Sequence, residues 1–290
     1  MPNFLQIPFR TARLLACASV FFSLALPFSL FSEEKPRIVS LNGTITEILF
    51  ALGAGDRLVG VDTSSYYPKE AVSLPKIGYQ RTLAAEGILS LKPNQIIGTN
   101  YAGPPATIEQ LTTFKVPMLI VQETLTIEGV EAKIEQIAKF ISKEKEGKAL
   151  IQAYKKQVAS LDGSKPKKPV RVLFIYSRSA TNVFVSGVNT PADAMIRLSG
   201  AENAMSGFNE FKPLTAEAVV AANPDVILIP EKSLEGLGGE KGLWELPGLN
   251  LTRAGKQKNV AVMDDLLLLG FGPRLANALG ELSLKWKSLK

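Results

Sequence analysis

"AAEGILSLKPNQIIG" (residues 84–98) and "TAEAVVAANPDVILI" (residues 215–229) follow the same pattern. Each stretch predicts a short helix, a turn at a proline, and a buried strand rich in β-branched residues. The spacing also agrees, because Glu86 precedes Pro93 by seven residues and Glu217 precedes Pro224 by seven residues. The chain therefore contains two related halves.

An apolar strand and a capped helix precede the repeated unit in each half. The strands are "RIVSL", from residue 37, and "VRVLFIYS", from residue 170. Residues that typically start or end helices follow each strand. They are Thr44, Glu47 and Gly53 in the first half, and Thr190, Pro191, Asp193 and Gly200 in the second. In this interpretation Thr44 and Thr190 cap the helix starts, and the two glycines close the helices.

Alternation of strands and helices predicts an α/β fold of two lobes, each with a central, mostly parallel sheet. Apolar residues at helical spacing from Ile127 to Leu161 predict a long helical connection, which Gly147 is expected to break or bend. The predicted domains are an N-terminal lobe (33–142), a linking helix (143–163) and a C-terminal lobe (164–290). The expected ligand site is the cleft between the lobes, where α/β proteins commonly form pockets.

The first 32 residues differ in composition from the rest of the chain. Arg10 and Arg13 precede an apolar run without charges, which is typical of a secretory signal peptide over residues 1–32. An uncleaved membrane anchor is the alternative. The single cysteine, Cys17, lies in this segment, and "LLAC" weakly resembles a lipoprotein cleavage box. Export without disulfides indicates a bacterial periplasm.

Composition excludes several kinds of site. The chain has no histidine, so Ser-His-Asp and Cys-His catalytic groups and histidine-based zinc sites are ruled out. Asp264 and Asp265 are adjacent, and as strand neighbours they would point to opposite faces. Without the two arginines of the signal, 31 basic residues face 27 acidic ones, a net charge of +4. That excess is too small and dispersed to indicate nucleic-acid binding.

Tyr79, in "KIGYQRTLAAEG", is the most suggestive side chain for binding. A phenolate is a good ligand for ferric iron, and tyrosine holds haem iron in some proteins. The guanidinium of Arg81, two residues on, would stabilise the negative charge of such a ligand. Tyr66, Tyr67 and Tyr101 are rival aromatic residues on predicted loops, and a packing role for Tyr79 remains the alternative.

Several segments together resemble the periplasmic haemin-binding proteins of bacterial haem ABC importers. They include "LPKIGYQRTLAAEGILSLKP", "NTPADAMIRLSGAENAMSGF", "YSRSA", "LPGLNLTRAGKQKNVAVMDD" and "LLGFGPR", and the resemblance runs from about Arg37 to the C-terminus. It implies a non-enzymatic periplasmic protein that captures haem b and delivers it to the membrane subunits of an importer. An outer-membrane haem receptor system would lie upstream.

The resemblance also implies roles for individual residues. Tyr79 would ligate the haem iron, and Arg81 would support it or contact the porphyrin, with Tyr67 and Tyr101 as further contacts. Arg178 stands where some relatives have a histidine, and a guanidinium cannot ligate iron. Arg178 would instead pair with a haem propionate; an exposed, solvated arginine is the alternative. Glu86 and Glu217 would dock onto the importer; the alternative is that both simply complement helix dipoles.

Two other interpretations remain open at the level of sequence. A cobalamin or ferric-siderophore carrier would have the same architecture. A periplasmic enzyme that processes a tetrapyrrole would need a proton-transfer or redox group, and the sequence offers no convincing one.

Overall fold

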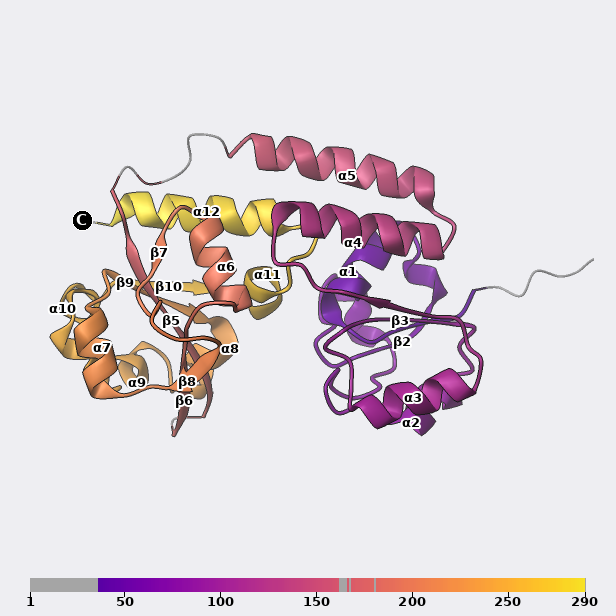
Figure 1. Ribbon diagram of the computed structural model, residues 1–290, viewed down its shortest axis with the longest axis horizontal. Helices are drawn as coiled ribbons and strands as arrows, with labels where there is room; N and C mark the ends of the chain where they lie inside the picture. The colour runs from indigo at the N-terminus through magenta and orange to yellow at the C-terminus, as the bar shows by residue number, and fades with distance from the viewer. Residues whose placement is uncertain (1–35, 162–165, 167, 180, 290) are drawn as a thin grey trace, which may run out of the picture. The chain divides into compact units, whose positions relative to one another are not determined.

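The computed structural model describes residues 36–161, 166, 168–179 and 181–289. The predicted signal peptide and Cys17 lie outside these residues. The described residues belong to one compact unit that contains two sheets. Figure 1 shows one sheet in each half of the chain, as the repeat predicts.

The first sheet is parallel throughout, with the order β2-β1-β3-β4 among the described residues. Its short strands alternate with helices and two 3₁₀ turns. In chain order these elements are β1 (Ile38–Ser40), α1 (Gly43–Ala51), η1 (Gly55–Arg57), β2 (Leu58–Val61), η2 (Lys69–Ser73), α2 (Ala85–Ser90), β3 (Gln95–Thr99), α3 (Pro105–Thr113) and β4 (Met118–Val121).

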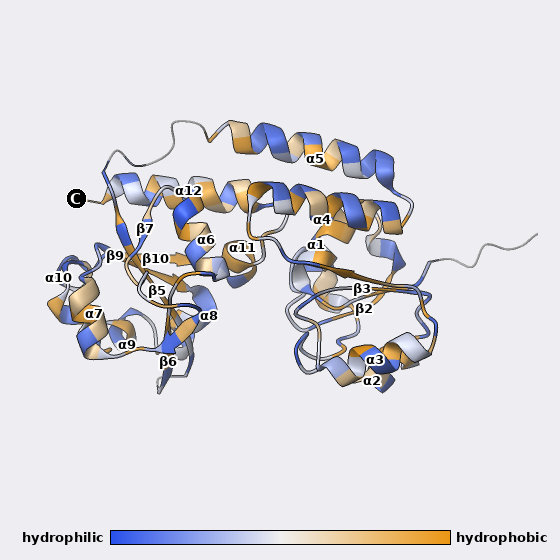
Figure 2. Cartoon of the chain, in the orientation of Figure 1, coloured by the Kyte–Doolittle hydropathy of each residue, from blue (hydrophilic) through white to orange (hydrophobic). Residues whose placement is uncertain are grey.

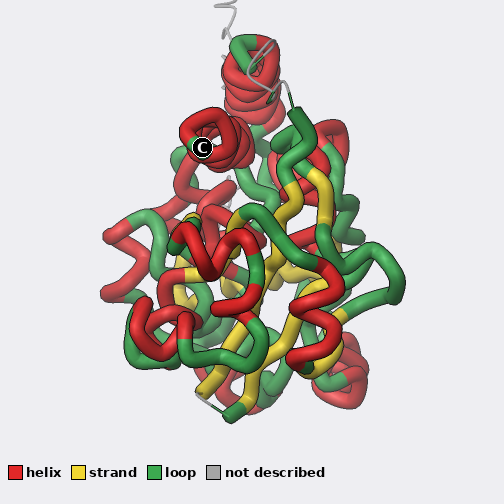
Figure 3. The backbone as a smooth tube through the Cα atoms, turned by 90° about the vertical axis from the view of Figure 1, so that its left-hand side faces the viewer, coloured by secondary structure: helices red, strands yellow, loops and turns green. Residues whose placement is uncertain are grey.

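The second sheet is mixed, with the order β10-β9-β5-β6-β8 and β7 beside β5 among the described residues. Strands β5, β9 and β10 are parallel, whereas β6 pairs antiparallel with β5 and β8, a hairpin that the sequence did not predict. Helices lie on both sides of these strands in Figure 3. The strands are β5 (Arg171–Ser179), β6 (Asn182–Ser186), β7 (Glu202–Asn203), β8 (Phe211–Pro213), β9 (Val226–Pro230) and β10 (Val260–Met263); the helices are α6 (Pro191–Leu198), α7 (Ala216–Ala222), α8 (Glu231–Gly236), α9 (Glu240–Trp244), α10 (Arg253–Gln257), α11 (Asp265–Leu269) and α12 (Leu275–Ser288), with the 3₁₀ turn η3 (Leu249–Leu251).

The predicted long helix is two helices, α4 (Ile127–Phe140) and α5 (Glu144–Ala159). The break falls at Ser142, whose φ is 56°, so the prediction of a break at Gly147 was wrong. Gly147 lies inside α5, where a Cβ would come within 2.5 Å of Ala138 Cβ on α4. The glycine thus permits close packing of the two helices. Helix α5 lies inside the segment 143–163, and the domain boundaries themselves stay a prediction.

Helix caps agree with the sequence in the second half and differ in the first. Thr190 caps α6, because its Oγ1 accepts from the Asp193 amide at 3.0 Å. In α1 the cap is Asn42, whose side chain accepts from the Thr44 amide at 2.8 Å, so the assignment of Thr44 as the cap was wrong. Gly53 and Gly200 follow their helices with φ values of 66° and 84°, as predicted for closing glycines.

The largest apolar core contains residues from both halves of the chain. It joins α1 and α4 of the first half to β5, α6 and α12 of the second, and includes the buried rings of Tyr154 and Trp286. Two smaller cores lie within the individual halves. Figure 1 shows α5 running alongside α4 and packed against α12, and Figure 2 shows that α5 is mostly hydrophilic. The two lobes are therefore joined by packed helices as well as by the chain.

Candidate functional site

Tyr79 lies on the irregular segment between β2 and α2. Hydrogen bonds between Val61 and the Pro75–Ile77 segment hold the incoming chain against the sheet edge. Gly78 then turns with a φ of 97°, a conformation that favours glycine, and the Thr82 amide donates to Tyr79 O at 2.8 Å. These hydrogen bonds fix the backbone of the turn, and Tyr79 is 41% exposed.

The residue after Tyr79 ties this turn to the rest of the first lobe. Gln80 Oε1 accepts from Asn42 Nδ2 at 2.8 Å, and Gln80 O accepts from the Gly103 amide at 2.8 Å. Within the described part of the chain, no hydrogen bond or ring contact occupies the Tyr79 side chain itself. Tyr79 thus combines a held main chain with a free phenol, which suits a ligand to an incoming metal centre.

Arg81 contacts a different tyrosine from the one that the sequence suggested. Its Cζ lies 4.8 Å from the centroid of the Tyr101 ring, a cation–π geometry. Burial raises the pKa of Tyr101, and the nearby Glu123 carboxylate raises it further. Tyr101 therefore stays a neutral phenol, which binds ferric iron less well than a phenolate does. The structure thus places Arg81, two residues after Tyr79, against Tyr101.

Tyr66 and Tyr67 contact the second half of the chain. Tyr66 Oη accepts from the Leu266 amide at 2.7 Å, and burial, followed by the charge of Asp264, raises the pKa of Tyr66. The ring of Tyr67 lies beneath Arg274, whose Cζ is 3.4 Å from the ring centroid. These contacts give Tyr66 and Tyr67, two of the three rivals of Tyr79, a role in joining the lobes. They also leave Tyr66 protonated and weaken it as an iron ligand.

Arg178 lies on the second lobe, near the end of β5. It is exposed, and its Cζ is 5.9 Å from the Tyr176 ring centroid. The Phe211 ring lies 6.4 Å from the same ring and is 41% exposed. The side chain is therefore free to meet an anionic group beside an aromatic surface. Among the described residues no hydrogen bond, ion pair or ring contact joins Arg178 to Tyr79, Arg81 or Tyr101.

Glu86 and Glu217 occupy equivalent places in the two halves. Each lies in the first turn of its helix, α2 or α7, and each is exposed. Each helix leads through a proline turn to a buried strand, β3 or β9. The two carboxylates are thus available to a partner, and both also complement a helix dipole.

Sequence reasoning missed the polar contacts between the lobes. Arg274 binds Glu47 with two hydrogen bonds, Nε to Oε1 at 3.0 Å and Nη2 to Oε2 at 2.8 Å. Thr44 Oγ1 donates to Gly270 O at 2.8 Å, and the buried Lys133 donates to Phe271 O at 3.2 Å. The Thr44 and Glu47 pair, interpreted as a helix cap, instead contacts the other lobe. The residues on the opposite side of this contact, Gly270, Phe271 and Arg274, lie in "LLGFGPR". The sequence alone assigned this motif no role.

The sequence suggested that Asp264 and Asp265 lie within a strand. In the structure both residues lie beyond the end of β10. Asp264 caps α11 by accepting from the Leu267 amide at 2.8 Å, and Asp265 accepts from the Lys232 amide at 3.2 Å. Both carboxylates therefore have structural partners. Among the described residues no group of His, Cys, Asp and Glu side chains is arranged to hold a metal ion, and no helix has the length and apolar character to cross a membrane.

Two α/β lobes joined by packed helices are the architecture of a substrate-binding protein. The chain belongs to the periplasmic binding protein family, whose model matches residues 38–267. Among solved structures, the periplasmic heme-binding protein RhuT from Roseiflexus sp. RS-1 in apo form is 43% identical, with a TM-score of 0.86 over 88% of this chain and 99% of that chain.

Two further relatives mark the range of ligands among similar proteins. The periplasmic heme-binding protein BhuT, in complex with two hemes, is 41% identical, with a TM-score of 0.83 over 87% of this chain and 98% of that chain. The vitamin B12-binding protein of Vibrio parahaemolyticus is 26% identical over 278 residues, which are 93% of this chain and 95% of its own. The chain is therefore more similar in sequence to these two heme-binding proteins than to this vitamin B12-binding protein.

Proposed function

We propose that this protein captures haem b in the periplasm and delivers it to the membrane subunits of an ABC importer. The observation that carries the proposal is Tyr79, an exposed phenol on a held backbone, in a chain 43% identical to a heme-binding protein. The predicted signal over residues 1–32 would export it, and an outer-membrane haem receptor would supply the ligand. The protein binds its ligand without chemical change, as members of a binding-protein family do.

The proposed site uses both lobes. Tyr79 ligates the iron, and Arg81 supports this ligand or contacts the porphyrin. Tyr67 and Tyr101 contribute aromatic contacts to the porphyrin, and Arg178 pairs with a propionate from the second lobe. The chemistry supports this division, because haem is a flat apolar ring with a metal centre and two carboxylates at one edge.

Cobalamin is the second candidate, because vitamin B12-binding proteins are also relatives of this chain. A direct comparison separates the two ligands. We expect haemin added to the purified apo protein to give a Soret band that saturates at one defined stoichiometry, and cyanocobalamin to leave the protein unliganded in equilibrium dialysis. Retention of cobalamin with no haemin spectrum would contradict the proposal. Conversion of bound haem to a new pigment would indicate an enzyme instead.

Glu86 and Glu217 are proposed to dock onto the importer. Their equivalent positions on α2 and α7, one on each lobe, support this role. A transporter built from two membrane subunits would present two basic contacts to such a pair. Charges at an exposed rim act mainly on the rate of association and are screened by salt.

A further inference from the structure

The motif "LLGFGPR" (residues 268–274), between α11 and α12, contacts the first lobe at several points. Two of its carbonyls accept hydrogen bonds from that lobe, one from the Thr44 hydroxyl at 2.8 Å and one from the Lys133 ammonium at 3.2 Å. Its last residue, Arg274, contacts side chains of the same lobe. One of them is Tyr67, which belongs to the proposed haem site.

The guanidinium of Arg274 is held along its edge and lies face-on against a ring. Its Nε and Nη2 donate to the two carboxylate oxygens of Glu47 at 3.0 and 2.8 Å. Such a bidentate pair fixes the plane of the guanidinium as well as its position. Its Cζ lies 3.4 Å from the centroid of the Tyr67 ring, well inside the range of a cation–π contact. Glu47 thus holds Arg274 directly over one face of Tyr67.

Tyr67 and Tyr79 lie on adjacent loops of the first lobe. The Thr63 amide, four residues before Tyr67, donates at 2.9 Å to the carbonyl of Gly78, the residue directly before Tyr79. Although Arg274 covers one face of its ring, Tyr67 is 40% exposed. The exposed part of the ring is therefore available to a ligand, and its orientation is set by a residue of the second lobe.

We propose that Arg274 is a positioning residue, which holds the Tyr67 ring in one orientation as a preformed contact for the porphyrin. A half-exposed side chain without such a partner samples several rotamers, and a ligand that orders it binds less tightly. The effect on haem rests on the proposed function. The hold on the ring is independent of any ligand and can be measured in the apo protein.

Arg274→Lys is the direct test, because lysine keeps a positive charge for Glu47 but lacks the planar group that lies on the ring. Haemin affinity is measured by Soret titration in the parent, in each single variant and in Tyr67→Ala, Arg274→Lys. We expect Arg274→Lys to weaken binding roughly 2- to 10-fold in the parent, the factor for ordering one side chain, and to have no effect in Tyr67→Ala. Equal losses in both backgrounds, or no loss in the parent, would overturn the inference.

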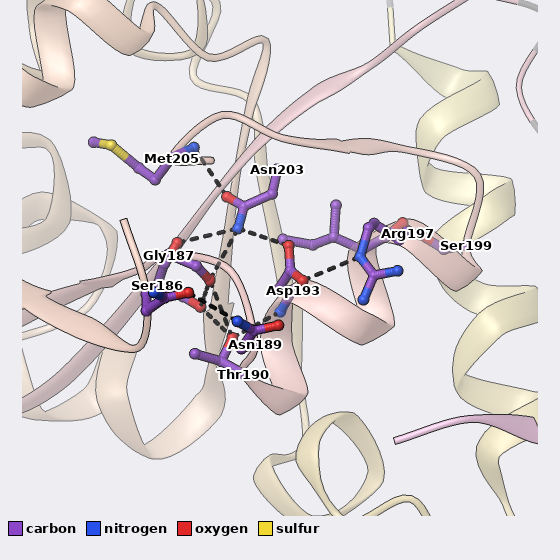
Figure 4. Close-up of polar contacts among 11 residues, drawn as sticks. Ser186, Gly187, Asn189, Thr190, Asp193, Arg197, Ser199, Asn203 and Met205 are labelled. Carbon is purple, nitrogen blue, oxygen red and sulfur yellow. Dashed lines mark hydrogen bonds and ion pairs between the residues drawn. The ribbon is translucent and has the colours of Figure 1, made fainter. Parts of the chain in front are cut away.

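Two control variants separate this role from a general disturbance. Thr44→Val removes another contact between the lobes and leaves Tyr67 untouched. Arg197→Lys makes the same substitution in the second lobe, where Arg197 Nε donates to Asp193 Oδ2 at 3.0 Å, as Figure 4 shows. Neither control should lower haemin affinity more in the parent than in Tyr67→Ala. A loss with Thr44→Val that requires Tyr67 would contradict a specific role for Arg274.

Fluorine NMR of the apo protein tests the hold on the ring itself. With 3-fluorotyrosine at all six tyrosines, the Tyr67 signal is the one that Tyr67→Ala removes. We expect Arg274→Lys to move this signal toward the position of a freely rotating fluorotyrosine; if that variant does not fold, Glu47→Gln should move it in the same direction by less. An unmoved signal would overturn the inference. Failure of the parent to bind haemin would instead refute the proposed function, and the fluorine spectrum would still test the hold on Tyr67.

Discussion

At the scale of residues, four tyrosines of the first lobe have different environments. Tyr66 and Tyr101 have raised pKa values because both are partly buried near carboxylates, which makes the phenolate costly. Tyr67 stacks on Arg274, and Tyr79 presents a free, 41% exposed ring. Ferric iron needs an anionic oxygen, so these environments favour Tyr79 over Tyr66 and Tyr101 as the ligand.

Haem affinity tests the role of Arg81. Its guanidinium lies over the Tyr101 ring and follows the proposed ligand Tyr79 by two residues. We therefore expect Arg81→Ala to weaken haemin binding, measured by titration of the Soret band, because a contact of the guanidinium with the ligand or the porphyrin is lost. Lys241→Ala, which removes an exposed positive charge on α9, serves as the control and should leave the affinity unchanged. Equal affinities of the parent and Arg81→Ala would exclude this role.

The Glu47 and Arg274 pair should contribute strongly to stability. Glu47 is 6% exposed and Arg274 23% exposed at their side chains, and the contact is bidentate. Glu47→Gln leaves a largely buried guanidinium without its counter-charge, so we expect the free energy of unfolding in urea to fall by about 3 kcal/mol. Double-mutant cycles with Arg274→Met should show coupling between the two sites, whereas additive effects would mean that the pair contributes little.

At the scale of elements, the packing of α4 against α5 depends on Gly147. Alanine would normally favour a helix at such a position, but its Cβ would meet Ala138 Cβ at 2.5 Å. We expect Gly147→Ala to lower the free energy of unfolding by roughly 1–3 kcal/mol, as overpacking does. Gly87→Ala in α2 has open space around its Cβ and should raise the stability slightly. A stabilised Gly147→Ala would show that the helices separate readily.

Local signals predicted these elements well wherever the partners are close in sequence. The Thr190 cap was correct because its acceptor and donor lie three residues apart. Thr44 and Glu47 have the same spacing, yet Asn42 caps the helix, and their partners lie more than 200 residues away. The proline turns and buried strands of both halves were equally clear. The antiparallel β5–β6 hairpin was not, because register between distant strands leaves little local trace.

The candidate site shows the same limit. Tyr79 and Arg81 were predicted from one motif, but the stacking of Arg81 on Tyr101 joins residues on separate loops. Asp62, whose buried carboxylate accepts from the hydroxyls of Ser64 and Ser65, carried no signal in the sequence.

At the scale of the whole molecule, the equivalent positions of Glu86 and Glu217 predict a transport defect without a binding defect. The double variant Glu86→Ala, Glu217→Ala should keep the parent's haem spectrum, because neither carboxylate is part of the proposed haem site. Haem uptake through the reconstituted importer should fall, most strongly at limiting protein concentration. Glu240→Ala, another exposed glutamate in the first turn of a helix, is the matched control. Normal uptake by the double variant would exclude docking through these residues.

The two lobes are joined by a shared apolar core, by α4, α5 and α12, and by polar contacts such as that of Glu47 with Arg274. Such a connection should keep the distance between Tyr79 and Arg178 nearly constant, because it does not allow the large hinge closure that extended linkers allow. With no histidine in the chain, we propose Tyr79 as the single protein ligand of the haem iron.

Electron paramagnetic resonance and absorption spectra of the haemin complex test this central claim most directly, with the parent compared with Tyr79→Ala and Tyr67→Ala. We predict a high-spin ferric spectrum with a phenolate charge-transfer band in the parent. Tyr79→Ala should remove that band and most of the haem affinity, whereas Tyr67→Ala should keep the band and lose less affinity. A low-spin, bis-ligated spectrum in the parent, or unchanged binding by Tyr79→Ala together with its loss in Tyr67→Ala, would contradict the account.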